Sequence, residues 1–217
     1  MQVLQDQRLA GKTALIAGAD CAIGHAVAWA LAHQGARGVL VGGDEQALRQ
    51  TVKAAPDHLD HLVLDVLRPR SCRLLGAEWG DEPLDVLIHV QALAVPARPG
   101  AVIAAIPALT RALVTGLRAA DFPRVVIVCV APFAQAQAEA WAYDRAMQHL
   151  PQALQQEFAW QDGPPGQGAV NAVRVSNVSM LQTQCGQASL AQTLLWLCQP
   201  QARTVSGAVL PVDLPCD

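Results

Sequence analysis

The residues TALIAGADCAIG, at positions 13–24, join a short uncharged strand to a turn of small residues. The next residues, HAVAWALAHQG at 25–35, have the Ala- and Leu-rich pattern of a helix that stops at Gly35. A buried strand, a tight turn and a helix that opens at a glycine form the first unit of a dinucleotide-binding sheet. Its glycines let the backbone approach a pyrophosphate, and the helix N–H groups point at that anion. This unit predicts an α/β fold with a Rossmann-like, doubly wound parallel sheet.

Alternating strand and helix patterns continue from this unit to the end of the chain, with no internal repeat or low-complexity linker. The alternation predicts one domain over residues 1–217. We expect strands at 13–17, 39–41, 61–65, 84–90, 122–131, 172–178 and 205–212. We expect helices at 25–35, 45–55, 67–80, 106–120, 141–158 and 189–198, and a loop at 161–168.

Composition restricts the class of partner. The net charge is −3 and there is no basic run, so we expect neither nucleic acid nor an anionic membrane as a partner. The polar N-terminus MQVLQDQR and the lack of a long apolar run predict a cytoplasmic protein. The six cysteines form no C-x-x-C pair, and no histidine lies at metal-ligand spacing from them, so we expect reduced thiols and no metal site. The charged fraction of 15% favours a surface partly buried against another subunit, although an alanine-rich genome bias would give a similar figure.

The opening LAGKTALIAGADCAIG, at 9–24, resembles that of the short-chain dehydrogenases/reductases, whose glycine motif reads T-G-x-x-x-G-x-G. Ala17, Gly18, Ala22 and Gly24 occupy the four motif positions, so alanine replaces the threonine and the middle glycine. The resemblance extends to LDVLIHV at 84–90 and to VSGAVLPV at 205–212. It implies that the chain is shortened before the helix at 106 and at the substrate lid near 180–188.

The resemblance also implies cofactor positions. Gly18, Ala22, Ile23 and Gly24 would face a dinucleotide, and Asp65 and Val66 would lie beside its adenine. Asp44, which follows the predicted second strand, could reach a ribose, but we favour it as the N-cap of the next helix. Because the middle glycine and the other family motifs in the cleft are replaced, we expect no cofactor; NAD or NADP is expected only if the protein is active.

The catalytic motif of the family is incomplete. Tyr143 lies 13 residues after Val130, the usual separation between the catalytic serine and tyrosine, so Val130 and Met147 stand at the serine and lysine positions. In Y-x-x-x-K, the lysine shares a helix face with the tyrosine and lowers its pKa, so that the phenol can exchange a proton near neutral pH. Met147 carries no charge, which leaves Tyr143 as a vestigial catalytic residue.

Three functions remain open at this stage. The first is a catalytically impaired protein that serves as a structural or regulatory subunit of a homo- or hetero-oligomer with an active family member. The second is an NAD(P)-dependent oxidoreductase acting on a ketone or alcohol, in which Tyr143 is the acid and His89 or Arg145 supplies the missing charge. The third is a dinucleotide sensor without chemistry.

Large apolar residues recur along the predicted helix 141–158 at helical spacing, namely Trp141, Tyr143, Met147, Leu150, Leu154 and Phe158. Their size favours a subunit interface over a core-facing stripe. The resemblance implies that helices 106–120 and 141–158 form this interface.

Overall fold

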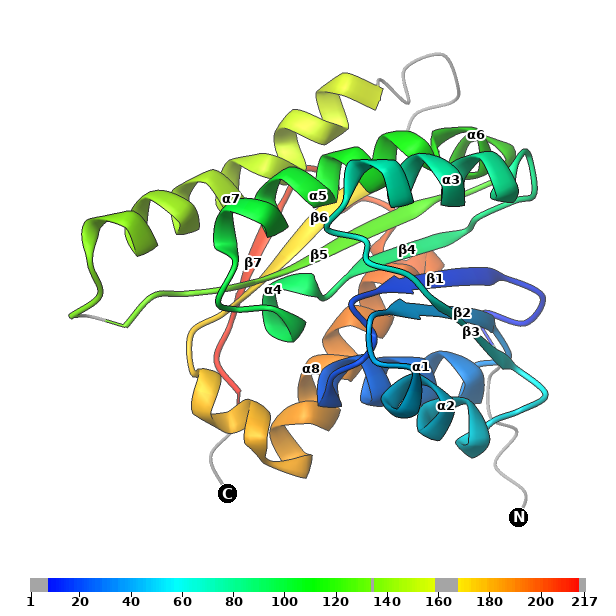
Figure 1. The fold of residues 1–217 in the computed structure, drawn as a ribbon, viewed down its shortest axis with the longest axis horizontal. Helices are drawn as coiled ribbons and strands as arrows, with labels where there is room; N and C mark the ends of the chain where they lie inside the picture. The colour runs from blue at the N-terminus through cyan, green and yellow to red at the C-terminus, as the bar shows by residue number, and fades with distance from the viewer. Residues whose placement is uncertain (1–7, 134, 159–167, 215–217) are drawn as a thin grey trace.

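The fold was examined in a computed structural model that describes residues 8–133, 135–158 and 168–214. A seven-stranded, all-parallel sheet runs through it in the order β3-β2-β1-β4-β5-β6-β7 (Figure 1). This order confirms the doubly wound α/β architecture. The strands are β1 Thr13–Ala17, β2 Arg37–Gly42, β3 Leu59–Val63, β4 Val86–His89, β5 Arg124–Val130, β6 Ala169–Val175 and β7 Val209–Val212.

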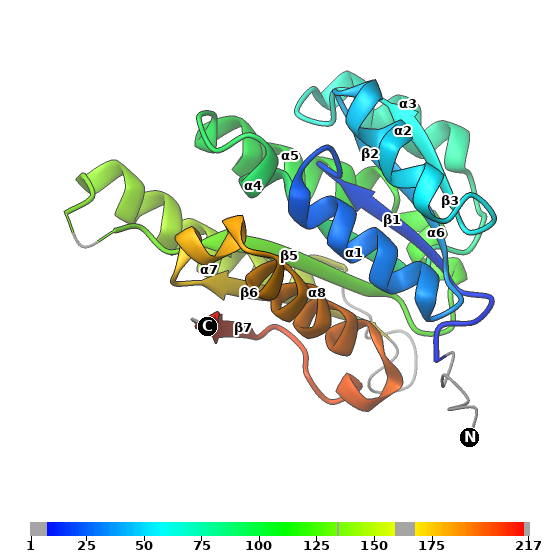
Figure 2. The same ribbon diagram turned by 90° about the horizontal axis from the view of Figure 1, so that it is seen from below.

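Helices cover both faces of the sheet (Figures 1 and 2). One layer holds α1 Ala22–His33, α2 Glu45–Ala54 and α8 Gln184–Cys198. The other holds α3 Pro69–Trp79, α5 Pro99–Ala112, α6 Val114–Ala119 and α7 Ala138–Phe158. The short helix α4, Gln91–Ala94, follows β4, and two 3-10 turns, η2 Val178–Gln182 and η3 Pro200–Ala202, flank α8.

Strand β1 shows how the sequence divides the core in two. Ala14 and Ile16 pack with α1 and α8, whereas Leu15 and Ala17 pack with the α3, α5 and α7 layer. Because successive side chains of a strand point to opposite faces, a strand covered on both faces is apolar throughout. This explains why residues 13–17 carry no charge and no alternation.

Several predicted boundaries are wrong. The helix expected at 106–120 begins at Pro99, where a proline lacks only an N–H that the first turn would leave unpaired, and α6 continues it after Leu113. The helix expected at 189–198 begins at Gln184, because Thr183 caps it by accepting the N–H of Gly186. The strands expected at 61–65 and 172–178 lie two and three residues earlier in the chain, at 59–63 and 169–175. The loop expected at 161–168 falls outside the described residues, apart from Gly168.

Most of the apolar stripe of α7 packs against the core of its own chain, whereas its first member, Trp141, is exposed. The interface expected on α7 stays a prediction. Met147, Leu154 and Phe158 are buried within the chain, and Tyr143 and Leu150 pack against the same cluster. Helix α7 lies on β5 and β6, and a helix on a sheet needs the same apolar period as a helix at an interface. Sequence spacing therefore could not separate the two.

Strand β7 forms one edge of the sheet. Ala172 and Ser176 of the β6 side donate their N–H groups to the carbonyls of Ala208 and Val212, so alternate residues of β7 face inward. Two positions between these carbonyls face outward, Val209 and Pro211, and the proline has no N–H.

Within the described residues, no helix is long and apolar enough to cross a membrane. The same part of the chain holds no group of three metal-ligating side chains, and no disulfide joins any of its five cysteines.

Candidate functional site

The crevice where the strand order reverses lies between β1 and β4, whose carboxyl ends are at Ala17 and His89. Ligands of open α/β sheets bind at such a switch point. Gly18 directly follows β1 with φ +80°, and a Cβ built on it would lie 2.8 Å from Gln91 Cα. Only glycine allows this turn to pass so close to the start of α4.

The turn leads into α1 through Cys21, whose Sγ lies 3.5 Å from the N–H of Gly24 and caps the helix. A Cβ on Gly24 would meet Ala19 O at 2.4 Å, so the second retained glycine is also required by packing. Ile23 is buried and Ala22 is exposed. The structure thus brings together the predicted positions Gly18, Ala22, Ile23 and Gly24.

Asp20 is a functional candidate that the sequence reasoning missed. Its Oδ2 accepts the N–H of Gly43 at 2.7 Å and that of Asp44 at 3.0 Å, across 23 and 24 residues of chain. A Cβ on Gly42 would lie 2.6 Å from Asp20 Cγ, which explains the glycine at the tip of β2. The sequence did carry one signal for this role, because Asp20 is an acidic residue in a turn that is otherwise made of small residues.

Asp44 caps α2, as favoured, because its Oδ1 accepts the N–H groups of Gln46 and Ala47. Asp65 lies just beyond β3, where it accepts the N–H of Leu67 and pairs with Arg68. Val66 is buried. Neither Asp65 nor Val66 lines the cavity described next, so the predicted adenine positions stay apart from it.

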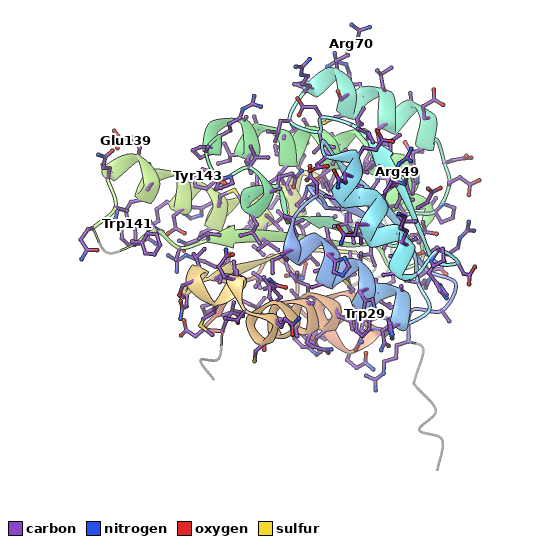
Figure 3. All side chains as sticks on the ribbon, turned by 60° about the horizontal axis from the view of Figure 1, so that its bottom comes forward. Trp29, Arg49, Arg70, Glu139, Trp141 and Tyr143 are labelled. Atoms are coloured by element: carbon purple, nitrogen blue, oxygen red, sulfur yellow. The ribbon has the colours of Figure 1, made fainter. Side chains whose placement is uncertain are left out.

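A cavity of about 700 Å³ opens beside the crevice, between the start of α1, α4, the end of β5, the start of α7 and η2. Val130 and Tyr143 both line it, as their predicted roles require. Figure 3 shows Tyr143 and Glu139 on the first turns of α7. The lining residues are Cys21, Ala22, Ile23, Ala92, Leu93, Val95, Pro96, Pro99, Val130, Ala131, Pro132, Phe133, Ala136, Gln137, Glu139, Ala140, Tyr143, Val178, Leu181 and Gln182.

The phenol of Tyr143 is poorly placed to give up its proton. Burial raises the pKa of Tyr143 to about 12, and the neighbouring Cys129 thiol adds to the shift. Met147, one helical turn further on, is completely buried in the core and has no charge to offset this effect. At neutral pH the phenol therefore stays protonated and acts as an ordinary hydrogen-bonding group.

The two candidate substitutes for the missing cation do not supply one. His89 is fully buried between Gln91 and Thr110, and burial lowers the pKa of His89 to about 4. The Thr110 hydroxyl donates to Ile106 O, so His89 Nε2–H donates to Thr110 Oγ1. His89 Nδ1 then has a free lone pair that faces the side-chain amide of Gln91. We orient this amide so that its NH2 group, which is otherwise unpaired, donates to Nδ1. Both ring nitrogens of a neutral His89 are then hydrogen-bonded. The other candidate, Arg145, points to solvent on the exposed face of α7.

A cation contacts Asp144, the residue that follows Tyr143, and it is already paired there. Arg174 of β6 donates Nε–H to Asp144 Oδ1 at 2.7 Å and an Nη2 hydrogen to Oδ2 at 2.9 Å. Gln148 donates a third hydrogen bond to Oδ2 at 2.7 Å. Asp144 is 1% exposed, and this carboxylate holds the Arg174 guanidinium in place.

No family model matches the chain. A curated Streptomyces protein named as a daunorubicin C-13 ketoreductase, DnrU, is 42% identical over 77 residues, which are 34% of this chain and 27% of that protein. The Pseudomonas aeruginosa RhlG/NADP active-site complex is 18% identical with a TM-score of 0.78, and the match covers 97% of this chain and 98% of that one. A hydroxysteroid dehydrogenase from Escherichia coli is 18% identical over 96% of this chain and 98% of that one, with a TM-score of 0.77. A short-chain dehydrogenase/reductase from Brucella melitensis is 20% identical over 95% and 96%, with a TM-score of 0.74.

The chain has the fold of the short-chain dehydrogenases/reductases. This confirms the resemblance at the level of the fold. The curated relative is aligned over about a quarter of its length, so its activity remains a statement about that protein.

Three features of the crevice and the cavity bear on how a nicotinamide dinucleotide would fit. The Ala22 methyl stands exposed at the turn where a pyrophosphate needs close backbone approach. The N–H groups at the β2 tip already bond to the Asp20 carboxylate, which would repel a 2′-phosphate. Among the described residues that line the cavity, Glu139 is the one charged group, so the lining offers an anion no cation.

Proposed function

We propose that this chain is a catalytically impaired protein of the short-chain dehydrogenase/reductase fold, which serves as a structural or regulatory subunit of a homo- or hetero-oligomer with an active relative. The single observation that carries the proposal is the residue one turn beyond Tyr143. Met147 is buried in the core at the place where the family's proton relay requires a cation. Proton transfer from a phenol whose pKa is about 12 is unfavourable at neutral pH.

The rest of the cavity supports the same proposal. Val130 offers no hydroxyl to hold a substrate oxygen, and the nearby Arg174 guanidinium is held by Asp144. The exposed Ala22 methyl at the turn and the Asp20 carboxylate at the β2 tip, which would repel a 2′-phosphate, support the part of the proposal that no cofactor is bound. Loss of the relay and loss of cofactor fit affect the same reaction, so together they weigh more than either does alone.

The oligomeric part of the proposal rests on the outward face of α7. Ala142, Ala146 and Ala153 are exposed there, on a flank of the helix that is turned away from the buried Met147 and Leu154. Small side chains let two helices approach closely, and the low charge of the whole chain is consistent with a covered surface. The adjoining α5 is tied to α7 by the ion pair between Arg111 and Glu157.

The alternative is an NAD(P)-dependent oxidoreductase that uses Tyr143 in a rearranged site. The ketoreductase relative and the NADP complex among the similar structures favour it. In that case, the positive charge that lowers the pKa of Tyr143 has to come from a group other than His89, Arg145 and Arg174.

The experiment that tests the proposal measures turnover. The purified protein is incubated with NADH or NADPH and a panel of ketones and aldehydes, and with the oxidised cofactors and the corresponding alcohols. We expect reduced-nicotinamide absorbance to change no faster than with the Tyr143→Phe variant. A measured turnover that Tyr143→Phe abolishes would overturn the non-catalytic assignment and support the oxidoreductase.

A further inference from the structure

The amino-terminal edge of the sheet, opposite the crevice, buries an arginine that no described carboxylate neutralises. Arg124 begins β5 and is 1% exposed. It shares its face of the strand with Val126 and Val128, so its side chain points into the α1 and α8 layer. Its Nη1 donates a long hydrogen bond of 3.4 Å to Pro123 O, whereas Nε and Nη2 have no partner in the described part of the chain. A guanidinium withdrawn from water normally finds acceptors for such donors.

The two unpaired donors, Nε–H and the neighbouring Nη2 hydrogen, form the side of a guanidinium that binds a carboxylate or phosphate through two parallel hydrogen bonds. This chain uses the same side of two other arginines. Arg174 holds Asp144 through Nε and Nη2, and Arg111 holds Glu157 through the same two atoms. We call the corresponding pair of donors the Arg124 fork. It has the geometry of an anion-binding group, and no described residue supplies the anion.

One buried carboxylate lies close to Arg124 along the backbone but is engaged elsewhere. The backbone carbonyl of Asp85 accepts the N–H of Arg124 at 2.7 Å. The side chain of Asp85 instead accepts hydrogen bonds from Lys12 Nζ and from the N–H of Thr13, each at 2.9 Å. Asp85 therefore neutralises Lys12, and the charge of Arg124 remains uncompensated.

A second guanidinium lies beside the first. The Cζ atoms of Arg124 and Arg203 lie 3.1 and 4.6 Å from the centroid of the Phe122 ring. Burial lowers the pKa of Arg124 to about 10, and the positive charge of Arg203 contributes to this shift. Both groups therefore carry their charge at neutral pH and repel each other. An anion that contacts both would remove this repulsion.

We propose that Arg124 and Arg203 bind the phosphate group of a small molecule at the amino-terminal edge of the sheet. A phosphate group carries about 1.5 to 2 negative charges at neutral pH, which matches two guanidiniums, whereas a single carboxylate matches only one. This inference goes beyond the proposed function, since the site lies at the edge of the sheet opposite the crevice and does not involve Tyr143.

Entry of the phosphate requires a small rearrangement, because the Arg124 fork is shielded from water. Arg203 is the neighbour that can supply it. Its side chain is exposed, and its backbone ends the short 3-10 turn η3, so a change of side-chain rotamer alone can move its guanidinium. Arg203 then turns outward, admits the phosphate to the fork and contacts it from the solvent side.

Binding is tested with inorganic phosphate as the probe, in a phosphate-free buffer held at constant ionic strength with sodium chloride. We expect a saturable rise in melting temperature and one site per chain in titration calorimetry, because a ligand that binds only the folded state stabilises it. Acetate should bind at least about tenfold more weakly, since it brings a single charge to two cations. The absence of a saturable phosphate effect, or acetate binding as tight as phosphate binding, would overturn the inference.

Location is tested by removing the fork. Arg124→Met keeps an unbranched side chain without the guanidinium, and it should abolish the phosphate-dependent rise in melting temperature. The matched change Arg70→Gln, at an exposed arginine on α3 (Figure 3), should leave phosphate binding unchanged. Phosphate binding that persists in Arg124→Met would place the anion elsewhere. If Arg124→Met does not fold, Arg203→Gln at the exposed partner should weaken phosphate about tenfold, and unchanged affinity would overturn the inference.

The contact itself is observed by NMR of the ¹⁵N-labelled protein. The side-chain Nε–H signal of Arg124, identified by its absence from Arg124→Lys, should shift in proportion to bound phosphate. Arg124→Lys keeps a positive charge but lacks the fork, so it should weaken phosphate severalfold. An Nε–H signal that does not move at saturating phosphate would contradict the contact. Turnover of nicotinamide cofactors is measured separately, so the failure of either proposal is distinguishable from the failure of the other.

Discussion

Asp144 holds the guanidinium of Arg174 through two hydrogen bonds of 2.7 and 2.9 Å, one residue after the phenol of Tyr143. The pair joins α7 to β6 and is almost fully withdrawn from water on the carboxylate side. It fixes the helix that carries Tyr143, and it holds the Arg174 guanidinium against Asp144. The structure thus uses this charge to hold α7 in place.

Removing the arginine of this pair should be costly, because the buried Asp144 carboxylate would be left without its counter-charge. We expect Arg174→Ala to lower the free energy of unfolding by about 3–5 kcal/mol. The double variant Asp144→Leu/Arg174→Met should recover much of the loss, since neither charge then remains buried. Urea denaturation followed by circular dichroism measures both values. Strictly additive effects of the two single changes would contradict a direct pair.

The neutral His89 should make stability depend on pH. The unfolded chain protonates this histidine near pH 6.5, whereas the folded chain does so only near pH 4, so the unfolded state binds the proton first. The contribution is therefore fully present above pH 6.5 and is lost as the pH falls toward 4, by about 3 kcal/mol in total. Denaturant unfolding at several pH values should show this loss in the unmodified protein. His89→Asn, which cannot take up the proton, should show a flatter curve, and an equal slope in both would contradict a buried neutral ring.

The contact between Asp20 and the β2 tip predicts a coupled pair of substitutions. Gly42→Ala should cost about 1–3 kcal/mol, because the new methyl would meet the Asp20 carboxylate at 2.6 Å. In an Asp20→Ala background the same change should cost much less, since the obstructing group is gone. Thermal melts of the four proteins give the coupling energy. A cost of Gly42→Ala that does not depend on residue 20 would show that another group limits the space.

Met147 should not tolerate the family's lysine without loss of stability. Its side chain is completely buried, so Met147→Lys introduces a charge among apolar residues, and we expect a loss of several kcal/mol. Met147→Leu is the matched control and should cost less than about 1.5 kcal/mol. Calorimetry can compare the two. A Met147→Lys protein as stable as the parent would mean that the cavity reaches this position after all.

The outward face of α7 provides a test of assembly that spares the core. Ala146→Glu should shift the elution volume toward the monomer in size-exclusion chromatography, with an almost unchanged melting temperature, because Ala146 is exposed. Leu154→Glu should instead unfold the protein, since Leu154 is 1% exposed within the core. The same elution volume for Ala146→Glu and the parent would remove support for an interface on this face.

Local patterns in the sequence predicted the first unit and the α2 cap well. The strand at 13–17 and the cap at Asp44 depend on neighbours within a few residues, and the structure has both. The sequence predicts the start of β3 two residues too late, because HLVLD at 61–65 and LDHLV at 59–63 both have the pattern of an edge strand. Pairing of Gly38 with Leu59 sets the actual register, and that pairing comes from another strand.

For the candidate site too, local patterns predicted some features, whereas contacts between distant residues could not be predicted. Val130 and Tyr143, placed at the serine and tyrosine positions by their spacing, both line one cavity. The contacts of Asp20 with the β2 tip and of Asp144 with Arg174 span 23 residues or more, so no local pattern announces them. The sequence also did not show which way the apolar residues of α7 face. A helix packed on a sheet and a helix packed on another subunit need the same apolar side chains.

Pro211 at the outer edge of β7 limits how copies of this protein can associate. A further parallel or antiparallel strand would need a donor at that point, and the proline ring supplies none. Continuous intermolecular sheets of the kind that grow into fibrils are therefore interrupted at this edge. Association of copies on this side of the molecule is therefore favoured through side-chain packing over strand pairing.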